Sequence, residues 1–379
     1  MAKNKPKKKK TLKQWIGKIH LWLGLSSGLI VFIVSITGCI FCFHDEIKDL
    51  TRDWRKVEAV NAPYLMPSVL QAKTKALYPN ATADMVVYHG SDRSALVYST
   101  EAGEAYNVYF NPYSGKFLHR EKTSDDFFLF IEDLHMHLLL PEAIGKQLVG
   151  IATIIFIIML LSGIVLWWPK KKTDLKKRLK IKWDAKWRRV NYDWHNVTGF
   201  YVALIALIVA LTGLTFSYEW MHKTMYFVGN MGSDYPEEKA TVTVDTLLAT
   251  SKTVIPVDIA YTTARKARPE DQMCFVWQQD HKNAIITGSY PESLDFDHQS
   301  NMFFHPATGE LLKQQLYDQK SAGMQLQEMN YGLHTGQYFN LPGKIIAFIA
   351  SLIAAALPVS GLVIWIGRNN KKSKTKIAA

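Results

Sequence analysis

The sequence predicts a mainly α-helical membrane protein with four transmembrane helices, built by an internal duplication whose two halves each carry an extracytoplasmic α+β module. Three observations predict this fold class: four long apolar runs, an uneven distribution of charge, and motifs that recur at a fixed spacing. A run of about 20 apolar residues crosses a bilayer as a helix, so the four runs define the topology.

The four apolar runs divide the chain of 379 residues into nine segments. The predicted transmembrane helices cover residues 15–43, 144–168, 195–220 and 343–367. The remaining segments are a basic tail over 1–14, an outer module over 44–143, a basic loop over 169–194, a second outer module over 221–342 and a basic tail over 368–379. The first run is long and lacks a small-residue cleavage pattern, so we expect a membrane helix and not a removable signal.

The net charge of +12 is distributed in a way that predicts the orientation in the membrane. Residues 1–20 contain eight lysines and no acid, and residues 169–194 contain eleven lysines and arginines. The long loops over 44–143 and 219–342 contain 30 of the 33 acidic residues. Because basic loops stay in the cytoplasm, we expect both termini and the middle loop there, with the long loops outside. The basic runs are interpreted as contacts with anionic lipid and not with nucleic acid.

Two motifs recur with one spacing and indicate the internal duplication. His20 and His195 each lie at the start of an apolar run, 175 positions apart. The Thr-Gly pairs at 37–38 and 212–213 are separated by the same 175 positions. Two unrelated helices are not expected to share a histidine, a Thr-Gly pair and their spacing. We therefore interpret the two halves as copies of one unit of helix, outer module and helix.

Seven of the twelve histidines lie at the ends of the predicted membrane helices. At the cytoplasmic edge these are His20 and His195, and at the outer edge they are His44, His135, His137, His222 and His334. A single histidine at a helix end is more often an interfacial residue that contacts headgroups. Ionisable side chains that face a bundle interior are instead functional candidates.

A duplication with two-fold pseudo-symmetry brings equivalent histidines face to face. His20 is then expected to oppose His195, and His135 to oppose His334. Two opposed imidazoles are what a six-coordinate b-type haem needs, and nearby glycines leave room for a flat macrocycle. Two haems, one near each membrane surface, are therefore predicted to carry electrons across the bilayer. Three other residues remain alternative outer haem ligands, ligands of substrate iron or surface residues: His44, His137 and His222.

Several motifs resemble the PepSY-associated transmembrane helix family: Lys-Ile-His20-Leu-Trp-Leu-Gly24, the Leu-His pairs ending at 135 and 334, the Ser-Gly helix endings at 162 and 360, and Asn-Pro-Tyr-Ser-Gly115. The resemblance extends from about residue 12 to residue 368. This family includes bacterial iron-regulated inner-membrane proteins and ferric-siderophore reductases.

The resemblance implies a protein of the bacterial inner membrane with PepSY-like periplasmic modules. It implies b-type haem bound by His20, His195, His135 and His334, and electron transfer outward to Fe(III) held by a siderophore or another chelate. The sequence contains no phosphate-binding loop or dinucleotide fingerprint, so the electron donor is expected to be another protein, a quinol or a reduced cytoplasmic carrier.

Two alternatives remain at this point. The first is a membrane-anchored scaffold whose outer modules regulate a peptidase or assist assembly of a respiratory complex, without redox activity. The second is a metal or siderophore transporter. The helices lack the broken segments and midplane acids that transporters commonly show, which disfavours the second alternative.

Overall fold

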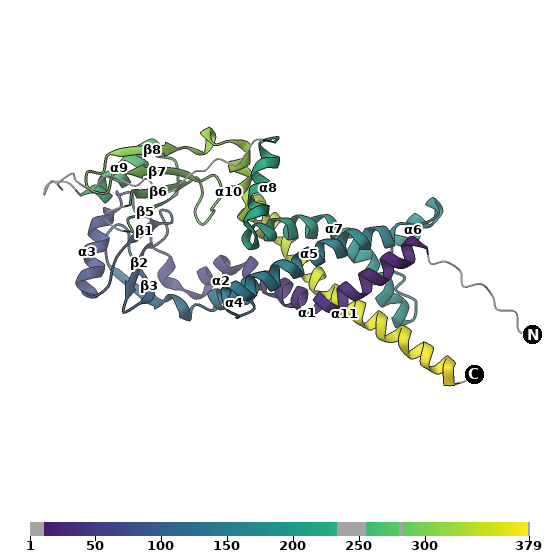
Figure 1. Ribbon diagram of the computed structural model, residues 1–379. Coiled ribbons are helices and arrows are strands. Elements are labelled where there is room, and N and C mark those ends of the chain that lie inside the picture. The colour runs from purple at the N-terminus through teal and green to yellow at the C-terminus, as the bar shows by residue number, and fades with distance from the viewer. Residues whose placement is uncertain (1–10, 233–254, 280–282, 378–379) are drawn as a thin grey trace, which may run out of the picture. The chain divides into compact units, whose positions relative to one another are not determined.

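The computed structural model describes residues 11–232, 255–279 and 283–377, and these divide into two compact units (Figure 1). The first unit, called the bundle, contains the chain up to residue 42, residues 131–219 and the chain from residue 333 onward. The second, called the sheet unit, contains residues 43–130 and the described part of 220–332.

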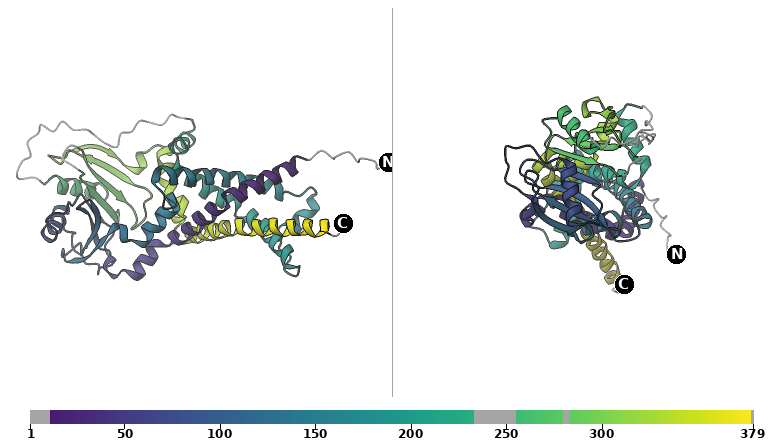
Figure 2. Two further views of the ribbon diagram at one scale, coloured as in Figure 1. Left: turned by 60° about the horizontal axis from the view of Figure 1, so that its bottom comes forward. Right: turned by 90° about the vertical axis from the view of Figure 1, so that its left-hand side faces the viewer.

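Four long helices form the bundle: α1 (Leu12–Cys42), α5 (Glu142–Trp167), α7 (Trp187–Ser217) and α11 (Asn340–Ile377). Each contains a stretch that is long and apolar enough to cross a membrane. Both α1 and α7 pack against α5 and against α11 (Figure 2, left). These observations confirm the prediction of a mainly helical, multi-pass membrane protein.

Shorter elements connect the long helices. The helices are α2 (His44–Thr51), α4 (Phe127–His137), α6 (Leu175–Arg178), α8 (Glu219–Gly229) and α10 (Ala322–Thr335). The 3-10 turns are η1 (Asp53–Arg55), η2 (Thr123–Asp125), η3 (Lys172–Asp174), η4 (Tyr317–Gln319) and η5 (Gln337–Phe339). The last turns of α4 and α10 belong to the bundle, so residues 135 and 334 lie there.

A single antiparallel sheet organises the sheet unit. Its strands are β1 (Met85–Tyr88), β2 (Ala95–Glu101), β3 (Glu104–Phe110), β4 (Phe117–Lys122), β5 (Met273–Trp277), β6 (Ile285–Tyr290), β7 (Ser300–Phe304) and β8 (Leu311–Gln315). Their order is β4-β3-β2-β1-β5-β6-β7-β8. The sequence suggested two separate modules, whereas β1 and β5 pair and join both segments, with Val86 opposite Val276.

This pairing has a simple physical cause. In a module made of β1 to β4 alone, the apolar strand β1 would be an open edge with unpaired backbone groups. Strand β5 is equally apolar and would be the open edge of the other segment. Each strand therefore satisfies the other's backbone groups at the centre of the sheet.

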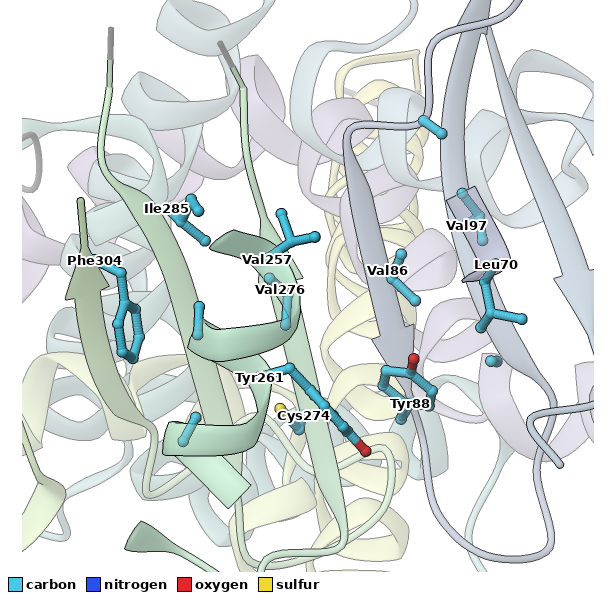
Figure 3. Packing of buried hydrophobic residues seen from close by; sticks show 14 of the residues in the cluster. Leu70, Val86, Tyr88, Val97, Val257, Tyr261, Cys274, Val276, Ile285 and Phe304 are labelled. Carbon is cyan, nitrogen blue, oxygen red and sulfur yellow. The ribbon is translucent and has the colours of Figure 1, made fainter. Parts of the chain in front are cut away.

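Helices α3 (Pro67–Leu77) and α9 (Pro256–Ala267) supply side chains to the main core on one face of the sheet (Figure 3). A proline starts each helix, where its missing N–H costs nothing because the first turn has no intrahelical acceptor for it. Leu70 of α3 and Phe110 and Phe304 of the strands are fully buried in this core.

The strand pairs β3–β4 and β7–β8 are connected by matching turns. Asn111 accepts hydrogen bonds from two backbone N–H groups of the first turn through its side-chain oxygen. His305 does the same in the second turn through Nδ1, so this buried histidine is part of the fold. Gly115 and Gly309 close the turns at φ angles of 67° and 72°, a region that favours glycine.

The two halves of the chain repeat one order of elements. Apart from the 3-10 turns and α6, each half runs as long helix, short helix, sheet-covering helix, four strands, short helix and long helix. The first series is α1, α2, α3, β1–β4, α4 and α5, and the second is α7, α8, α9, β5–β8, α10 and α11.

Candidate functional site

Two groups of histidines lie in the bundle, at its near end, where α1 begins, and at its far end, where α1 ends. At the near end, His20 of α1 and His195 of α7 line one cavity of about 470 Å³. All four long helices contribute to its wall. The cavity therefore brings together the two histidines that the sequence predicted to oppose each other.

The wall of this cavity combines flat apolar surface with positive charge. The glycines that line it are Gly17, Gly24, Gly28, Gly163, Gly199 and Gly361. Three cations also line it: Lys13, Arg178 and Arg368. Such a cavity suits a flat, largely apolar molecule that carries carboxylates at one edge, since guanidinium groups bind carboxylates well.

Two of these cations are held in place by backbone carbonyls. The Lys13 ammonium donates to the Trp168 carbonyl at 2.7 Å, and the Arg178 guanidinium donates to the Trp167 carbonyl at 2.6 Å. The Trp167 indole donates in return to the Arg178 carbonyl at 3.1 Å. A lysine has three N–H donors and an arginine has five, so both side chains keep donors for a ligand.

Both imidazoles at the near end contact serine hydroxyls of neighbouring helices. The His20 Nδ1 lies 2.8 Å from Ser162 Oγ of α5. The His195 Nδ1 lies 2.8 Å from Ser360 Oγ of α11. Because both contacts use Nδ1, the nitrogen left for a metal on each ring is Nε2.

The far end repeats this arrangement with threonines. The His135 Nδ1 lies 3.0 Å from Thr37 Oγ1 of α1, and the His334 Nδ1 lies 3.0 Å from Thr212 Oγ1 of α7. The His334 Nδ1 also lies 3.0 Å from the Val209 carbonyl oxygen. A carbonyl only accepts hydrogen bonds, so Nδ1 of His334 carries the proton.

The imidazoles of the far pair are spaced as two ligands of one metal ion would be. The ring centroids of His135 and His334 are 6.1 Å apart, and the ring planes make an angle of 70°. A metal bound to both rings by bonds of about 2 Å would hold the centroids roughly 6 Å apart. Among the described residues no group of three or more His, Cys, Asp or Glu side chains is placed to hold a metal ion.

The three alternative histidines have other partners. His44 of α2, in the sheet unit, lies 3.2 Å from the Asp45 carboxylate, and the His137 Nδ1 lies 2.9 Å from Asp133 Oδ1. The His222 Nδ1 lies 3.1 Å from the Gln327 side-chain amide nitrogen, which is a donor. In its neutral form His222 would then carry its proton on Nε2, the reverse of His334.

One buried acid of the sheet unit has an unusual environment. Asp297 is 2% exposed, and the described residues offer neither of its carboxylate oxygens a hydrogen bond. Burial, together with the nearby charge of Asp295, raises the pKa of Asp297 to about 7. This carboxyl group packs against Gly332 of α10, where an added Cβ would lie 2.1 Å from Asp297 Oδ2.

Sequence reasoning missed the groups that surround the histidines. In the sequence Ser162 and Thr37 stand out only as parts of repeated helix motifs, and their recurrence next to glycine at matching positions is the available signal. Lys13, Arg178 and Arg368 belong to the basic segments whose charge predicts the topology. Only the folded structure shows that these three cations line one cavity, where they could bind an anionic group.

Four helices of membrane length, with paired histidines between them, define a multi-pass membrane protein with candidate cofactor sites inside its bundle. A family characterised by a PepSY-associated TM region matches residues 18–368. Because this match covers most of the chain, the protein belongs to that family, as its motifs predicted. A comparison with curated proteins finds no match.

Proposed function

We propose that this protein is a di-haem b electron-transfer protein that reduces ferric iron bound to a siderophore or a similar chelate. The arrangement of the four histidines is the main support. Equivalent positions of the two halves supply His20 with His195 at one end of the bundle, and His135 with His334 at the other. One imidazole on each side of an iron is the ligand set of a six-coordinate b-type haem.

We infer that the halves arose by duplication and that the near end faces the cytoplasm of a bacterial cell, in its inner membrane. The shared order of elements and the shared spacing of the histidine motifs support the duplication. The basic residues at 1–20 and 169–194 support the orientation. The sheet unit would then lie in the periplasm.

At the near end, His20 and His195 would hold the haem iron through Nε2, while Lys13, Arg178 and Arg368 would bind its two carboxylates. Bound haem would supply a one-electron carrier at each end of the bundle. The apolar helices around each site would reduce the contact of a bound haem with water, and such burial is one of the factors that set a haem potential.

The two sites are far enough apart to serve the two membrane surfaces. The far histidine His135 contacts Gly38, which follows His20 on α1 by 18 residues. At about 1.5 Å per residue this corresponds to roughly 27 Å along the helix axis. The hydrocarbon core of a bilayer is about 30 Å thick, so each site would lie near one surface.

The electron donor would approach the near end and the iron chelate the far end. The sequence carries no motif for a nicotinamide or flavin cofactor, so the donor is a quinol, a protein or a small reduced carrier. The ferric chelate is the substrate and would gain one electron. Reduction lowers the affinity of the chelator for iron because hard oxygen ligands bind Fe(II) less tightly than Fe(III).

Purified full-length protein from haem-replete cells tests the proposal. We expect a Soret band, low-spin α and β bands after dithionite, and two haems per chain by pyridine haemochrome analysis. His20→Ala and His195→Ala should each remove the same haem, and His135→Ala and His334→Ala the other. Dithionite-reduced protein should be reoxidised by a ferric siderophore.

Colourless protein would refute the proposal and leave a membrane-anchored scaffold as the better description. Loss of different haems in His20→Ala and His195→Ala would refute the pairing at the near end. Retention of both haems without reoxidation by any ferric chelate would leave electron transfer but reject the substrate class.

A further inference from the structure

Each of the four candidate ligands contacts a hydroxyl-glycine dipeptide on a neighbouring helix. His20 contacts Ser162-Gly163, His195 contacts Ser360-Gly361, His135 contacts Thr37-Gly38, and His334 contacts Thr212-Gly213. In every case the hydroxyl oxygen lies within hydrogen-bond distance of Nδ1. A Cβ added at the glycine would lie 3.1 to 3.5 Å from Cε1 of the same ring. The same contact therefore occurs four times, with the dipeptide on a different long helix each time.

The direction of these hydrogen bonds follows from the way each hydroxyl uses its single proton. Ser162 Oγ donates to the Met159 carbonyl at 3.2 Å, and Ser360 Oγ donates to the Leu357 carbonyl at 3.0 Å. Thr37 and Thr212 donate in the same way to carbonyls one turn earlier in their own helices. With its proton used in this way, each hydroxyl offers the histidine only its lone pairs, so Nδ1–H would be the donor.

At the far end a glycine is needed beside the hydroxyl because the imidazole edge lies directly on the helix backbone. A Cβ added at Gly38 or Gly213 would lie 3.2 or 3.1 Å from Cε1 of His135 or His334. These distances are shorter than an ordinary carbon–carbon contact of about 3.5–4.0 Å. The glycine thus allows the ring to approach closely enough for Nδ1 to reach the neighbouring hydroxyl.

We infer that the four Ser/Thr-Gly dipeptides are positioning elements that fix each histidine as its Nδ1–H tautomer and direct the Nε2 lone pair toward haem iron. This inference rests on the proposed haem ligation and adds a role for residues outside the ligand set. A ligating histidine usually donates its second N–H to a fixed acceptor, which orients the ring and raises its basicity. Here a side-chain hydroxyl inside the membrane is that acceptor.

The structure also ranks the four hydroxyls. The described residues give the His20 Nδ1 one hydrogen-bond partner, Ser162. The His334 Nδ1 has both Thr212 and the Val209 carbonyl within 3.0 Å. Removing the Ser162 hydroxyl therefore leaves Nδ1–H without an acceptor, whereas removing the Thr212 hydroxyl does not. Ser162→Ala should have the larger effect on its haem.

The test measures the midpoint potential of each haem by spectroelectrochemistry in Ser162→Ala and Thr212→Val. A ligand that donates a hydrogen bond stabilises ferric iron, so losing the acceptor should favour the ferrous form of the near-end haem by about tenfold. For one electron this is a rise of about 59 mV. Thr212→Val should shift the far-end haem in the same direction by clearly less.

Matched variants separate positioning from packing. Ser26→Ala is the control, since Ser26 is exposed and donates to the Leu23 carbonyl without contacting a histidine, and neither potential should change. Ser162→Thr restores the hydroxyl and should return the near-end potential toward the wild-type value. If Ser162→Ala loses the haem altogether, retention by Ser162→Thr supports the inference.

Unchanged potentials in Ser162→Ala with both haems bound would overturn the inference. Loss of the near-end haem from both Ser162→Ala and Ser162→Thr would also overturn it, because Ser162 would then act only through packing. These results differ from failure of the proposed function, in which the wild-type protein itself carries no haem.

Discussion

Replacing Gly38 by alanine should weaken binding of the proposed haem at the far end, and replacing Gly163 should leave binding of the proposed near-end haem unchanged. At Gly38 the new Cβ would lie 3.2 Å from His135 Cε1, and at Gly163 it would lie 3.5 Å from His20 Cε1. Ordinary contacts between carbon atoms begin at about 3.5 Å. The His135 ring must therefore move by roughly 0.3 Å, whereas the His20 ring can stay where it is.

A shift of roughly 0.3 Å uses more than half of the tolerance of about 0.5 Å within which functional side chains must be held. His135 would be pushed away from the Thr37 hydroxyl, which lies 3.0 Å from Nδ1. Disturbing the partners of a metal ligand typically costs 10- to 100-fold in affinity. We expect haem at the far end to dissociate about tenfold faster in Gly38→Ala.

The assay follows transfer of haem from the purified variant to an excess of a haem-free acceptor protein. Wild-type protein and Gly163→Ala should lose haem at similar rates, and Gly38→Ala should show one fast phase that accounts for one of its two haems. Equal rates for Gly38→Ala and wild type would refute the contact argument. Equal acceleration in both variants would show that any added methyl group disturbs the bundle.

Three further predictions concern other residues. His44→Ala, His137→Ala and His222→Ala should each retain two haems by pyridine haemochrome analysis, because their rings contact Asp45, Asp133 and Gln327; loss of one haem would identify a missed ligand. Leu70→Ala should destabilise the fully buried core of the sheet unit by about 2–5 kcal/mol in denaturant titrations of the full chain, and a change below about 1 kcal/mol would contradict this burial. Asp297 has a folded pKa of about 7 against about 3.9 in an unfolded chain, so unfolding releases its proton and stability should fall as pH rises from about 4 to 7, by roughly 4 kcal/mol at most. In thermal melts at pH 4 to 8, Asp297→Asn should remove that fall in stability. An equal fall in both proteins would refute the role of Asp297.

The helices of this protein could be predicted from its sequence because bilayer thickness imposes a length and a composition on each of them. The apolar runs at 15–43 and 195–220, for example, correspond to α1 (Leu12–Cys42) and α7 (Trp187–Ser217). The joined sheet could not be predicted. Pairing of β1 with β5 depends on a register between distant segments, and no turn or spacing in the sequence specifies that register.

The candidate site was predicted in part. Recurrence identified His20 and His195 because equivalent residues of two similar halves tend to lie together. It could not identify Ser162 as the partner of His20 or Thr37 as the partner of His135. Serine and threonine in membrane helices commonly bond only a carbonyl of their own helix. Here they do so and also lie 2.8 and 3.0 Å from a histidine Nδ1 of another helix.

The central pairing of the sheet has a consequence for biosynthesis. Strand β1 ends at Tyr88, and its partner β5 begins at Met273, 185 residues later, after two more long helices have been made. Until then the newly made first half presents an apolar strand with no neighbour on one side. A ribosome stalled or a chain cleaved between the two halves would therefore release a fragment prone to pair with other copies of itself, so neither half is expected to survive alone.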